Sequence, residues 1–368
     1  MTASLKIGPL TSDVPDAAVV WDELLAVSDS DPLFNSRSWQ ELWWSIWGRP
    51  AGFELTPVSI GQAGGPRALA PLYVERRSLK GIPVRRLQFM GANEQTLSTP
   101  RCEYRDILAA GVDRPAADRA LLDTIARLQW DDFILRDVAT NSPLIAALHQ
   151  WSRDHGFRLR TIYRDRAYAQ TCDGTFADYL AGLKPEVRRK LYNKRKQLSQ
   201  LGTLALENSY PHAVDSFFDI LNGFHRTRWG AELYGTAGLG FQKELLGRLA
   251  EQGAEPWLSV MRLNGEPISV SYNILFQGRV YNIQSGFNEE VQKSLSLGLI
   301  HIGYLLEAAF AHPDVKVVDF LAGYGKKSNY KADICNEIVE MHSFQVVRSP
   351  LLKLLYWLND LQKRRRPR

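Results

Sequence analysis

Residues 257–320 constrain the fold of this chain more than any other part of the sequence. Three β-prone runs, separated by two tight turns that contain glycine, predict an antiparallel meander over residues 257–285. A helix predicted over residues 295–311 ends before a His-Pro pair, and an apolar strand follows over residues 315–320. A meander followed by a helix and a further strand is typical of a mixed α/β sheet.

The first half of the chain repeats this order of elements. Residues 53–89 predict a hairpin and a third strand, and a helix over 116–128, a strand over 133–138 and a helix over 142–155 follow. The repeat is one of hydropathy order and not of residue identity. Because 368 residues exceed the length at which a single core keeps growing, we expect two domains.

The region between the two halves is helical and strongly basic. Residues 176–201 predict a helical region interrupted at Pro185, and a second helix follows over residues 213–229. The expected divisions are a first domain over residues 1–165, a second over 166–349 with a basic helical insertion at about 176–230, and an amphipathic helix with a basic tail over 350–368.

Cationic residues concentrate in two short stretches. Residues 184–196 hold seven Lys and Arg against a single Glu, and residues 363–368 hold five more, whereas the whole chain has a formal net charge of +5. The remainder is acidic on balance, which indicates two local anion-facing patches and argues against a surface that binds DNA. The three cysteines lack the spacing of a metal site or of a disulfide framework, so we expect neither.

The hydropathy pattern predicts a cytoplasmic protein. No run approaches the roughly 20 apolar residues of a membrane span, and the first residues lack the basic start and apolar stretch of a signal peptide. Residues 350–362 are rich in leucine and lie next to the basic tail, a composition that favours peripheral contact with the inner face of the cell membrane. Packing of these apolar residues on the second domain is the alternative.

Three segments together resemble one known acetyltransferase family. They are the basic stretch that follows Asp178-Tyr179-Leu180, the helix end Phe224–Trp229, and a helix start at Lys293–Gly298 combined with Asp319, Phe320, Gly323, Tyr330 and Lys331. Over residues 165–345 they are similar to the CelD-like exopolysaccharide and cellulose-biosynthesis acetyltransferases of the GNAT superfamily, which are related to the Fem peptidyltransferases. The resemblance implies two tandem GNAT-like α/β domains with mixed central sheets, and an N-acyltransferase that uses acetyl-CoA.

The expected donor turn departs from the family pattern. GNAT enzymes hold the coenzyme A pyrophosphate on a glycine-rich turn at a helix start, where this chain keeps only Gly298 and has leucines at the other glycine positions. A helix start still offers free N–H groups and a positive dipole to a phosphate, and Lys293, Ser294 and Ser296 add a charge and two hydroxyls. We expect this segment to bind the donor, and the alternative is that a serine only caps the helix.

Acyl transfer to an amine needs a deprotonated amine and a protonated leaving thiolate. Asp319 closes an apolar strand, where burial would raise its pKa toward the working range of a base, or else it caps the turn that follows. The resemblance implies that Tyr330 is the acid and that Gly323 and Lys331 belong to the substrate site. A loop with three lysines would also suit a solvated turn.

The basic stretch supplies further candidates for binding phosphate. On a regular helix Arg188 and Arg195 fall on one side and Arg189 on the next, a face that suits the donor pyrophosphate, a lipid-linked phosphate or a cyclic dinucleotide. A solvated helix is the alternative. Candidate acceptor-binding residues end the next predicted helix, where the cations also complement the helix dipole: His225, Arg228 and Trp229.

The expected acceptor is an amino group on a sugar or lipid-linked precursor of an envelope polysaccharide or exopolysaccharide. A second hypothesis keeps the fold but takes aminoacyl-tRNA as donor, as the Fem branch does. A third makes the chain a regulatory protein that binds an anionic ligand such as a cyclic dinucleotide. A fold alone does not choose among these functions.

Overall fold

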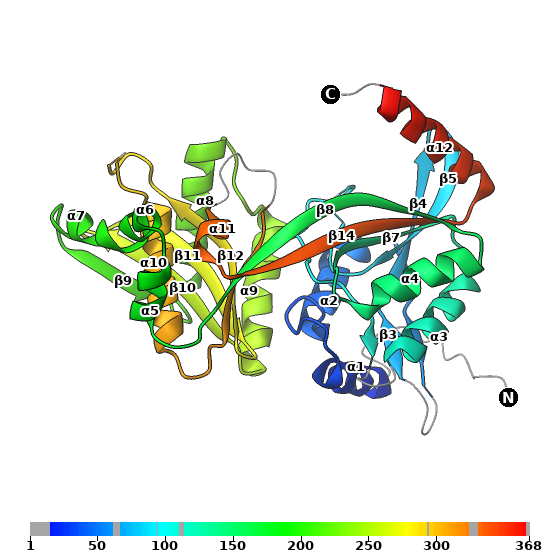
Figure 1. Ribbon diagram of the computed structural model, residues 1–368, viewed down its shortest axis with the longest axis horizontal. Helices are drawn as coiled ribbons and strands as arrows, with labels where there is room; N and C mark the ends of the chain where they lie inside the picture. The colour runs from blue at the N-terminus through cyan, green and yellow to red at the C-terminus, as the bar shows by residue number, and fades with distance from the viewer. Residues whose placement is uncertain are drawn as a thin grey trace. The chain divides into compact units, whose positions relative to one another are not determined.

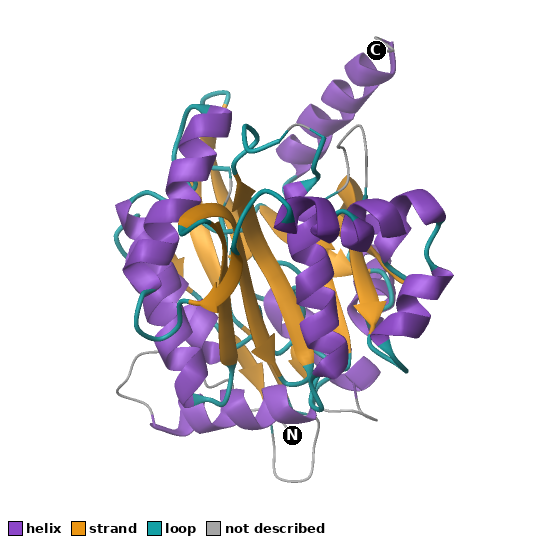
Figure 2. Ribbon diagram, turned by 90° about the vertical axis from the view of Figure 1, so that its left-hand side faces the viewer, coloured by secondary structure: helices purple, strands orange, loops and turns teal. Residues whose placement is uncertain are grey.

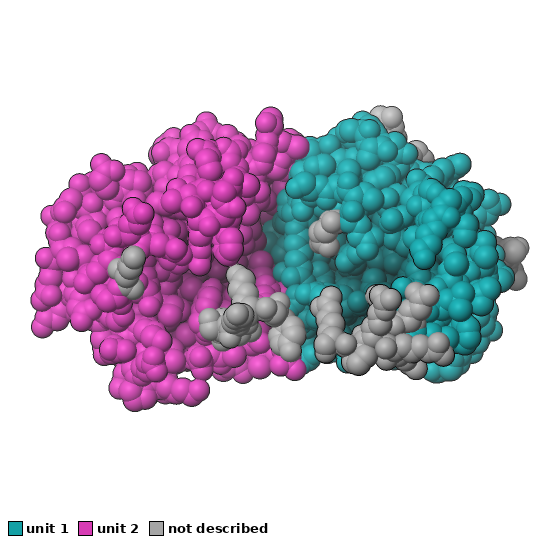
Figure 3. Space-filling view, turned by 90° about the horizontal axis from the view of Figure 1, so that it is seen from above, with its two compact units in different colours: residues 1–165, 340–368 teal, residues 166–339 magenta. Residues whose placement is uncertain are grey.

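The computed structural model describes residues 15–61, 67–93, 95–109, 114–292, 294–323 and 330–365. The chain forms two compact units, one of residues 1–165 and 340–368 and the other of residues 166–339 (Figure 3). The strands β8 (Arg158–Thr171) and β14 (Glu337–Val347) belong in part to each unit. The sequence placed residues 340–349 in the second domain, whereas the structure groups them with the first unit because they pair there with β7.

The first unit combines a sheet with two covering helices. Its further elements are α1 (Pro15–Val27), α2 (Arg37–Trp43), the π-helical turn η1 (Trp44–Gly48), β1 (Glu54–Leu55), β2 (Val58–Ile60), β3 (Ala68–Ala70), β4 (Leu72–Leu79), β5 (Ile82–Phe89), β6 (Leu108–Ala109), α3 (Arg114–Ala126), β7 (Asp132–Ala139), α4 (Pro143–Asp154) and α12 (Pro350–Arg365). The main sheet has the order β1-β4-β5-β7-β14-β8, and β2, β3 and β6 form a small separate sheet.

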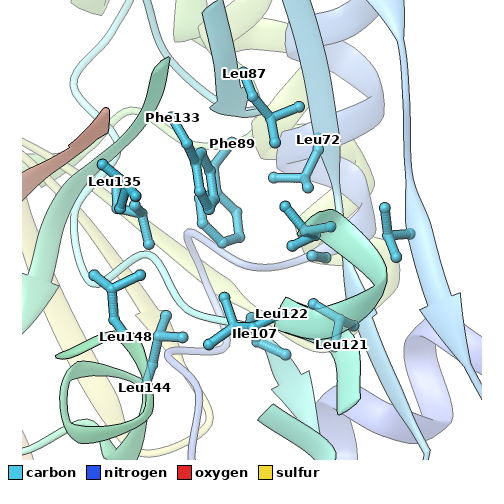
Figure 4. Packing of buried hydrophobic residues seen from close by; sticks show 14 of the residues in the cluster. Leu72, Leu87, Phe89, Ile107, Leu121, Leu122, Phe133, Leu135, Leu144 and Leu148 are labelled. Carbon is cyan, nitrogen blue, oxygen red and sulfur yellow. The ribbon is translucent and has the colours of Figure 1, made fainter. Parts of the chain in front are cut away.

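The core of the first unit lies between its main sheet and the helices α3 and α4. Leu121 and Leu148 from these helices pack toward Phe89 and Phe133, whose rings stack with centroids 5.9 Å apart (Figure 4). Four tryptophans of α2 and η1 are also buried in this unit: Trp39, Trp43, Trp44 and Trp47.

The second unit contains the remaining strands of the 11-stranded sheet and the basic segment. Its elements are α5 (Phe176–Gly182), α6 (Pro185–Arg188), the π-helical turn η3 (Arg189–Asn193), α7 (Arg195–Ser199), β9 (Leu204–Asn208), α8 (Val214–Trp229), α9 (Thr236–Glu251), β10 (Glu255–Leu263), β11 (Glu266–Phe276), β12 (Arg279–Phe287), α10 (Leu297–Ala311), β13 (Val317–Ala322) and α11 (Lys331–Ile334). The strand order is β8-β13-β12-β11-β10-β9. The predicted meander is β10, β11 and β12, and the predicted helix and strand after it are α10 and β13.

Helices cover both faces of the second unit's sheet (Figure 2). Tyr272 on β11 packs against Phe217 and Phe218 of α8, and its hydroxyl donates to Gln242 of α9 at 2.9 Å. Ser269, an odd number of residues away on the same strand, contacts α10 instead, because successive strand residues alternate between faces. Helix α10 therefore lies on one face, and α8 and α9 lie on the other.

Each unit contains a pair of parallel neighbouring strands joined by one helix. In the first unit β5 pairs with β7 over Arg86–Gln88, and in the second unit β12 pairs with β13 over Arg279–Tyr281. In both units the pairing is short, and the later strand then takes a left-handed residue, Asp137 at φ 50° and Leu321 at φ 57°. The order strand–helix–parallel strand thus occurs twice, as expected for two tandem α/β units with mixed sheets.

No helix in the described ranges is long and apolar enough to cross a membrane.

Candidate functional site

Asp319 lies where the pairing of β12 and β13 ends and the two strands separate. This carboxylate is fully buried at the end of the parallel pairing, and Arg279 on β12 donates to its Oδ2 at 2.8 Å. Its Oδ1 accepts the backbone N–H of Leu321 at 2.7 Å, which holds Leu321 in its left-handed conformation. Both oxygens have a partner within the chain, so the contacts favour the structural alternative for Asp319 over proton abstraction.

Lys331 lies directly against the end of β13. Its ammonium donates to the carbonyl oxygens of Phe320, Leu321 and Ala322, the last two at 3.0 and 3.3 Å. A Cβ at Gly323 would lie 3.0 Å from this ammonium, so the glycine leaves room for the lysine. The structure therefore brings Gly323 and Lys331 together at the end of β13, where the ammonium of Lys331 binds the last backbone carbonyls of the strand.

Tyr330 begins the short helix α11 beside the same strand end. Its ring packs against the apolar cluster that contains Phe320 and Ile334. Burial raises the pKa of the Tyr330 phenol, and the neighbouring Cys335 thiol adds to the shift. The phenol thus keeps its proton at neutral pH, which is the state that a proton donor needs.

The start of α10 lacks a capping hydrogen bond from its own N-cap side chain. Ser296 is the N-cap residue, and its hydroxyl accepts no hydrogen bond from the first turn of the helix. Gly298 lies under the ring of Phe287, the last residue of β12, and a Cβ there would be 3.0 Å from this ring. The first turn of α10 therefore begins at the end of β12 with backbone N–H groups that Ser296 does not satisfy. Lys293 lies outside the described residues.

One cation of the basic segment contacts this helix start, and two more act on its charge. Lys194 donates through its ammonium to the backbone carbonyl of Ser294. Desolvation lowers the pKa of Lys194, and the like charges of Arg189 and Lys190 lower it further. Lys190 also pairs with Glu186 at 2.7 Å, so one acid balances the charge of only one of these three cations. Mutual repulsion among cations is relieved when an anion binds, so this cluster favours a phosphate ligand.

The other two candidate arginines of the segment are held by protein groups. Arg195 forms an ion pair with Glu307, and its guanidinium lies 3.6 Å from the ring centroid of Tyr304 on α10. Arg188 donates to the carbonyl of Leu180 at 3.4 Å. These contacts fasten the segment to α10 and α5, and for Arg195 they favour a structural role.

The candidate acceptor residues lie at the end of α8, next to the donor segment. The guanidinium of Arg228 lies 5.0 Å from the ring centroids of Trp229 and Phe287, and it pairs with Glu289 at 3.0 Å. Trp229 is 66% exposed, whereas His225 is half-buried. Since Phe287 also contacts Gly298, one chain of contacts joins the end of α8 to the start of α10.

The equivalent place in the first unit is filled by the chain itself. Beyond the β5–β7 pairing, the backbone N–H of Arg105 donates to the carbonyl of Asp137 at 3.2 Å. Arg101 binds the Asp137 carboxylate through two nitrogens at 2.9 and 3.0 Å, and it pairs with Asp165 at 2.9 Å. The edge that β5 leaves on β7 is therefore occupied by residues of the first unit itself.

Sequence reasoning missed Lys194, Arg279 and Phe287. Lys194 lies in the basic stretch, but only the fold shows which of its cations face α10. No metal-binding group of three or more His, Cys, Asp or Glu occurs among the residues that the structure describes.

Comparisons with known proteins agree with this geometry. Residues 185–332 match the family model described as acetyltransferase (GNAT) domain, and no curated protein matches the chain by sequence. The crystal structure of FemX is similar, with a TM-score of 0.62 and 12% identity over 92% of this chain and 98% of that one. A conserved protein of unknown function from Bacteroides thetaiotaomicron has a TM-score of 0.57 and 11% identity, over 94% of this chain and 100% of its own.

A third similar structure is the C-terminal domain of a putative lysylphosphatidylglycerol synthetase from Agrobacterium fabrum. Its TM-score is 0.51 at 8% identity, over 95% of this chain and 96% of that one. Identities this low establish a shared fold and carry no statement about substrates. The second unit is accordingly a GNAT acetyltransferase-fold domain within a tandem arrangement.

Proposed function

We propose that this GNAT-type acyltransferase transfers an acyl group, with acetyl-CoA as the donor, to an amino group of an envelope or exopolysaccharide sugar precursor. The observation that carries the proposal is the open start of α10 beside the cluster of Arg189, Lys190 and Lys194. A helix start with convergent cations suits the diphosphate of coenzyme A. In this proposal, the cations and the N–H groups of the helix start bind the diphosphate in place of the glycine-rich donor turn that the family uses.

Donor binding divides between backbone and side chains in this proposal. The N–H groups of the first turn of α10 donate to the phosphate oxygens, and Arg189 and Lys194 neutralise their charge. The hydroxyls of Ser294 and Ser296 remain available for further hydrogen bonds. Lys293, from the sequence, is a further candidate cation of the same site.

The reaction forms a C–N bond and breaks the thioester C–S bond. The amine attacks the thioester carbonyl and loses one proton to solvent water, and the sulfur leaves as a thiolate that takes up one proton from a tyrosine, which water then reprotonates. Tyr330 is the proposed proton donor to the thiolate because its phenol is protonated and lies beside the end of β13. Asp319 acts as a positioning residue that holds the parting of β12 and β13 through Arg279 and Leu321.

The acceptor lies in this proposal against the end of α8. The exposed ring of Trp229 offers a flat apolar face for a sugar, and His225 and Arg228 supply polar contacts. The proposed place of action is the cytoplasm, next to the inner face of the cell membrane, because polysaccharide precursors are commonly carried on lipid.

One panel of ligands tests the proposal against its alternatives. The full chain is heated alone, with acetyl-CoA, with aminoacyl-tRNA and with a cyclic dinucleotide, and the unfolding temperature is measured. Stabilisation by acetyl-CoA, followed by acetylation of an amino sugar precursor, supports the proposal. Stabilisation by aminoacyl-tRNA alone would make the chain a Fem-like transferase, and stabilisation by the cyclic dinucleotide alone would make it a regulatory protein.

A further inference from the structure

Helix α12 packs on the first unit through one face. Leu352, Leu355 and Tyr356 lie on this face, in a cluster with Val84 of β5 and Val347 of β14. Figure 1 shows α12 in red beside β4 and β5. The apolar residues of α12 that the sequence assigned to either a membrane or the second domain therefore pack in part on the first unit.

Polar contacts fix the rotation of α12 about its axis. Asp360 binds Arg158 at 2.9 Å and Arg160 at 2.6 Å, both on β8. Arg160 also lies 4.5 Å from the ring centroid of Tyr356, whose hydroxyl donates to the buried Asp132 at 3.2 Å. Because these anchors are on the packed side, the opposite face of the helix is held outward.

The outward face is also apolar. It carries four large side chains within about two turns, all at helical spacing and each between 44% and 53% exposed: Leu351, Leu354, Trp357 and Leu358. Single exposed apolar residues are ordinary on protein surfaces, but a continuous group on one helix face indicates a contact surface. Among the described residues, the other large exposed apolar side chains are scattered over different elements.

The sequence has cationic residues at the end of α12 and in the turn that packs beside this helix. The last turn of α12 contains Lys363, Arg364 and Arg365, and the sequence continues with Arg366 and Arg368. Lys80 is exposed at the turn between β4 and β5, whose flanking residues Leu79 and Ile82 pack against α12. A second copy of the chain would bring like charges together, whereas an anionic lipid surface complements them.

We propose that the outward face of α12 docks on an anionic lipid surface, with the helix lying along that surface. The leucines and Trp357 would enter the boundary between head groups and acyl chains, and the basic turn would contact the lipid phosphates. This inference concerns where the protein binds and does not depend on the acyl transfer proposed above.

Vesicle binding tests the docking surface. Full-length protein is sedimented with vesicles in which about a third of the lipid is phosphatidylglycerol, and with vesicles of phosphatidylcholine alone. We expect binding to the anionic vesicles, which weakens as salt rises from about 0.1 M to about 0.5 M. The double variant Leu354→Gln/Leu358→Gln should bind about tenfold more weakly, and Trp357→Gln should weaken binding independently.

A matched control distinguishes binding through this surface from non-specific hydrophobic binding to vesicles. Leu201 and Leu206 are 42% and 41% exposed in the second unit, so the double variant Leu201→Gln/Leu206→Gln removes a similar apolar area and should leave vesicle binding unchanged. Stabilisation by acetyl-CoA is measured on every variant and should not change, which keeps failure of docking distinct from failure of the donor site. Equal binding of wild type and both α12 variants would overturn the proposal. So would concentration-dependent dimerisation that the same variants abolish.

Discussion

His301 on α10 should make the stability of the second unit depend on pH. The imidazole is buried between two serines, with Nδ1 2.8 Å from Oγ of Ser269 and Nε2 2.9 Å from Oγ of Ser259. Burial lowers its pKa from the ordinary value of 6.5 to about 3. The unfolded chain therefore takes up a proton on this residue at a pH where the folded protein does not.

The sign and size of the effect follow from this difference. Stabilisation of the folded state by the neutral imidazole is complete above pH 6.5 and is lost as the pH falls from 6.5 toward 3. Each pH unit inside that window costs about 1.4 kcal/mol, so lowering the pH from 7 to 4.5 should remove about 2.5 kcal/mol through this one residue.

Urea unfolding of the wild type and of His301→Gln, followed by circular dichroism at pH 7 and pH 4.5, measures this contribution. The variant is less stable at pH 7, because it leaves a buried serine without its partner. Its further loss at pH 4.5 should be about 2.5 kcal/mol smaller than that of the wild type. His212→Gln, at an exposed position of the same unit, should behave as the wild type does. An equal acid loss in wild type and His301→Gln would refute the reasoning.

Three further substitutions test the site. Asp319→Asn breaks the ion pair with Arg279 and should lower the free energy of unfolding by about 2 kcal/mol, while turnover falls less than tenfold. A fall in turnover of about a hundredfold in a folded variant would instead identify Asp319 as a general base. Tyr330→Phe should lower turnover about a hundredfold and leave coenzyme A affinity, measured by calorimetry, unchanged. Gly303→Ala places a Cβ against the carbonyl oxygen of Leu191 in η3 and should lower the free energy of unfolding by about 1–3 kcal/mol. Gly247→Ala, which has open space around it, should not lower it. Equal unfolding temperatures of the two variants would refute the close packing of Gly303 on η3.

The elements that the sequence predicted are those whose pattern is set locally. Glycine turns and alternating residues mark β10, β11 and β12, and apolar spacing marks α10. The sequence did not predict β8, because its first half is rich in arginine and becomes a strand only through pairing with distant segments. Long-range pairing also explains why the partnership of Asp319 with Arg279, 40 residues apart, could not be predicted.

The basic segment shows how a local irregularity changes a site. A regular helix puts Arg188 and Arg195 on one side, but the π-helical turn η3 adds a residue to the turn and shifts the register of everything after it. Arg195 then stacks on Tyr304, and Lys194 reaches the start of α10. Helical periodicity alone therefore does not give the neighbours of these cations.

Calorimetric titration with coenzyme A tests the central claim, that the open start of α10 and its cations hold the donor. We predict one binding site per chain, because the equivalent edge of the first unit is occupied by Arg101 and Arg105. Lys194→Glu should weaken binding by about tenfold or more, as expected for the loss of a charge-assisted contact, whereas Lys196→Glu, the same charge change at an exposed position of α7, should have little effect. Equal weakening by both variants, unchanged affinity in Lys194→Glu, or two sites per chain would contradict the account.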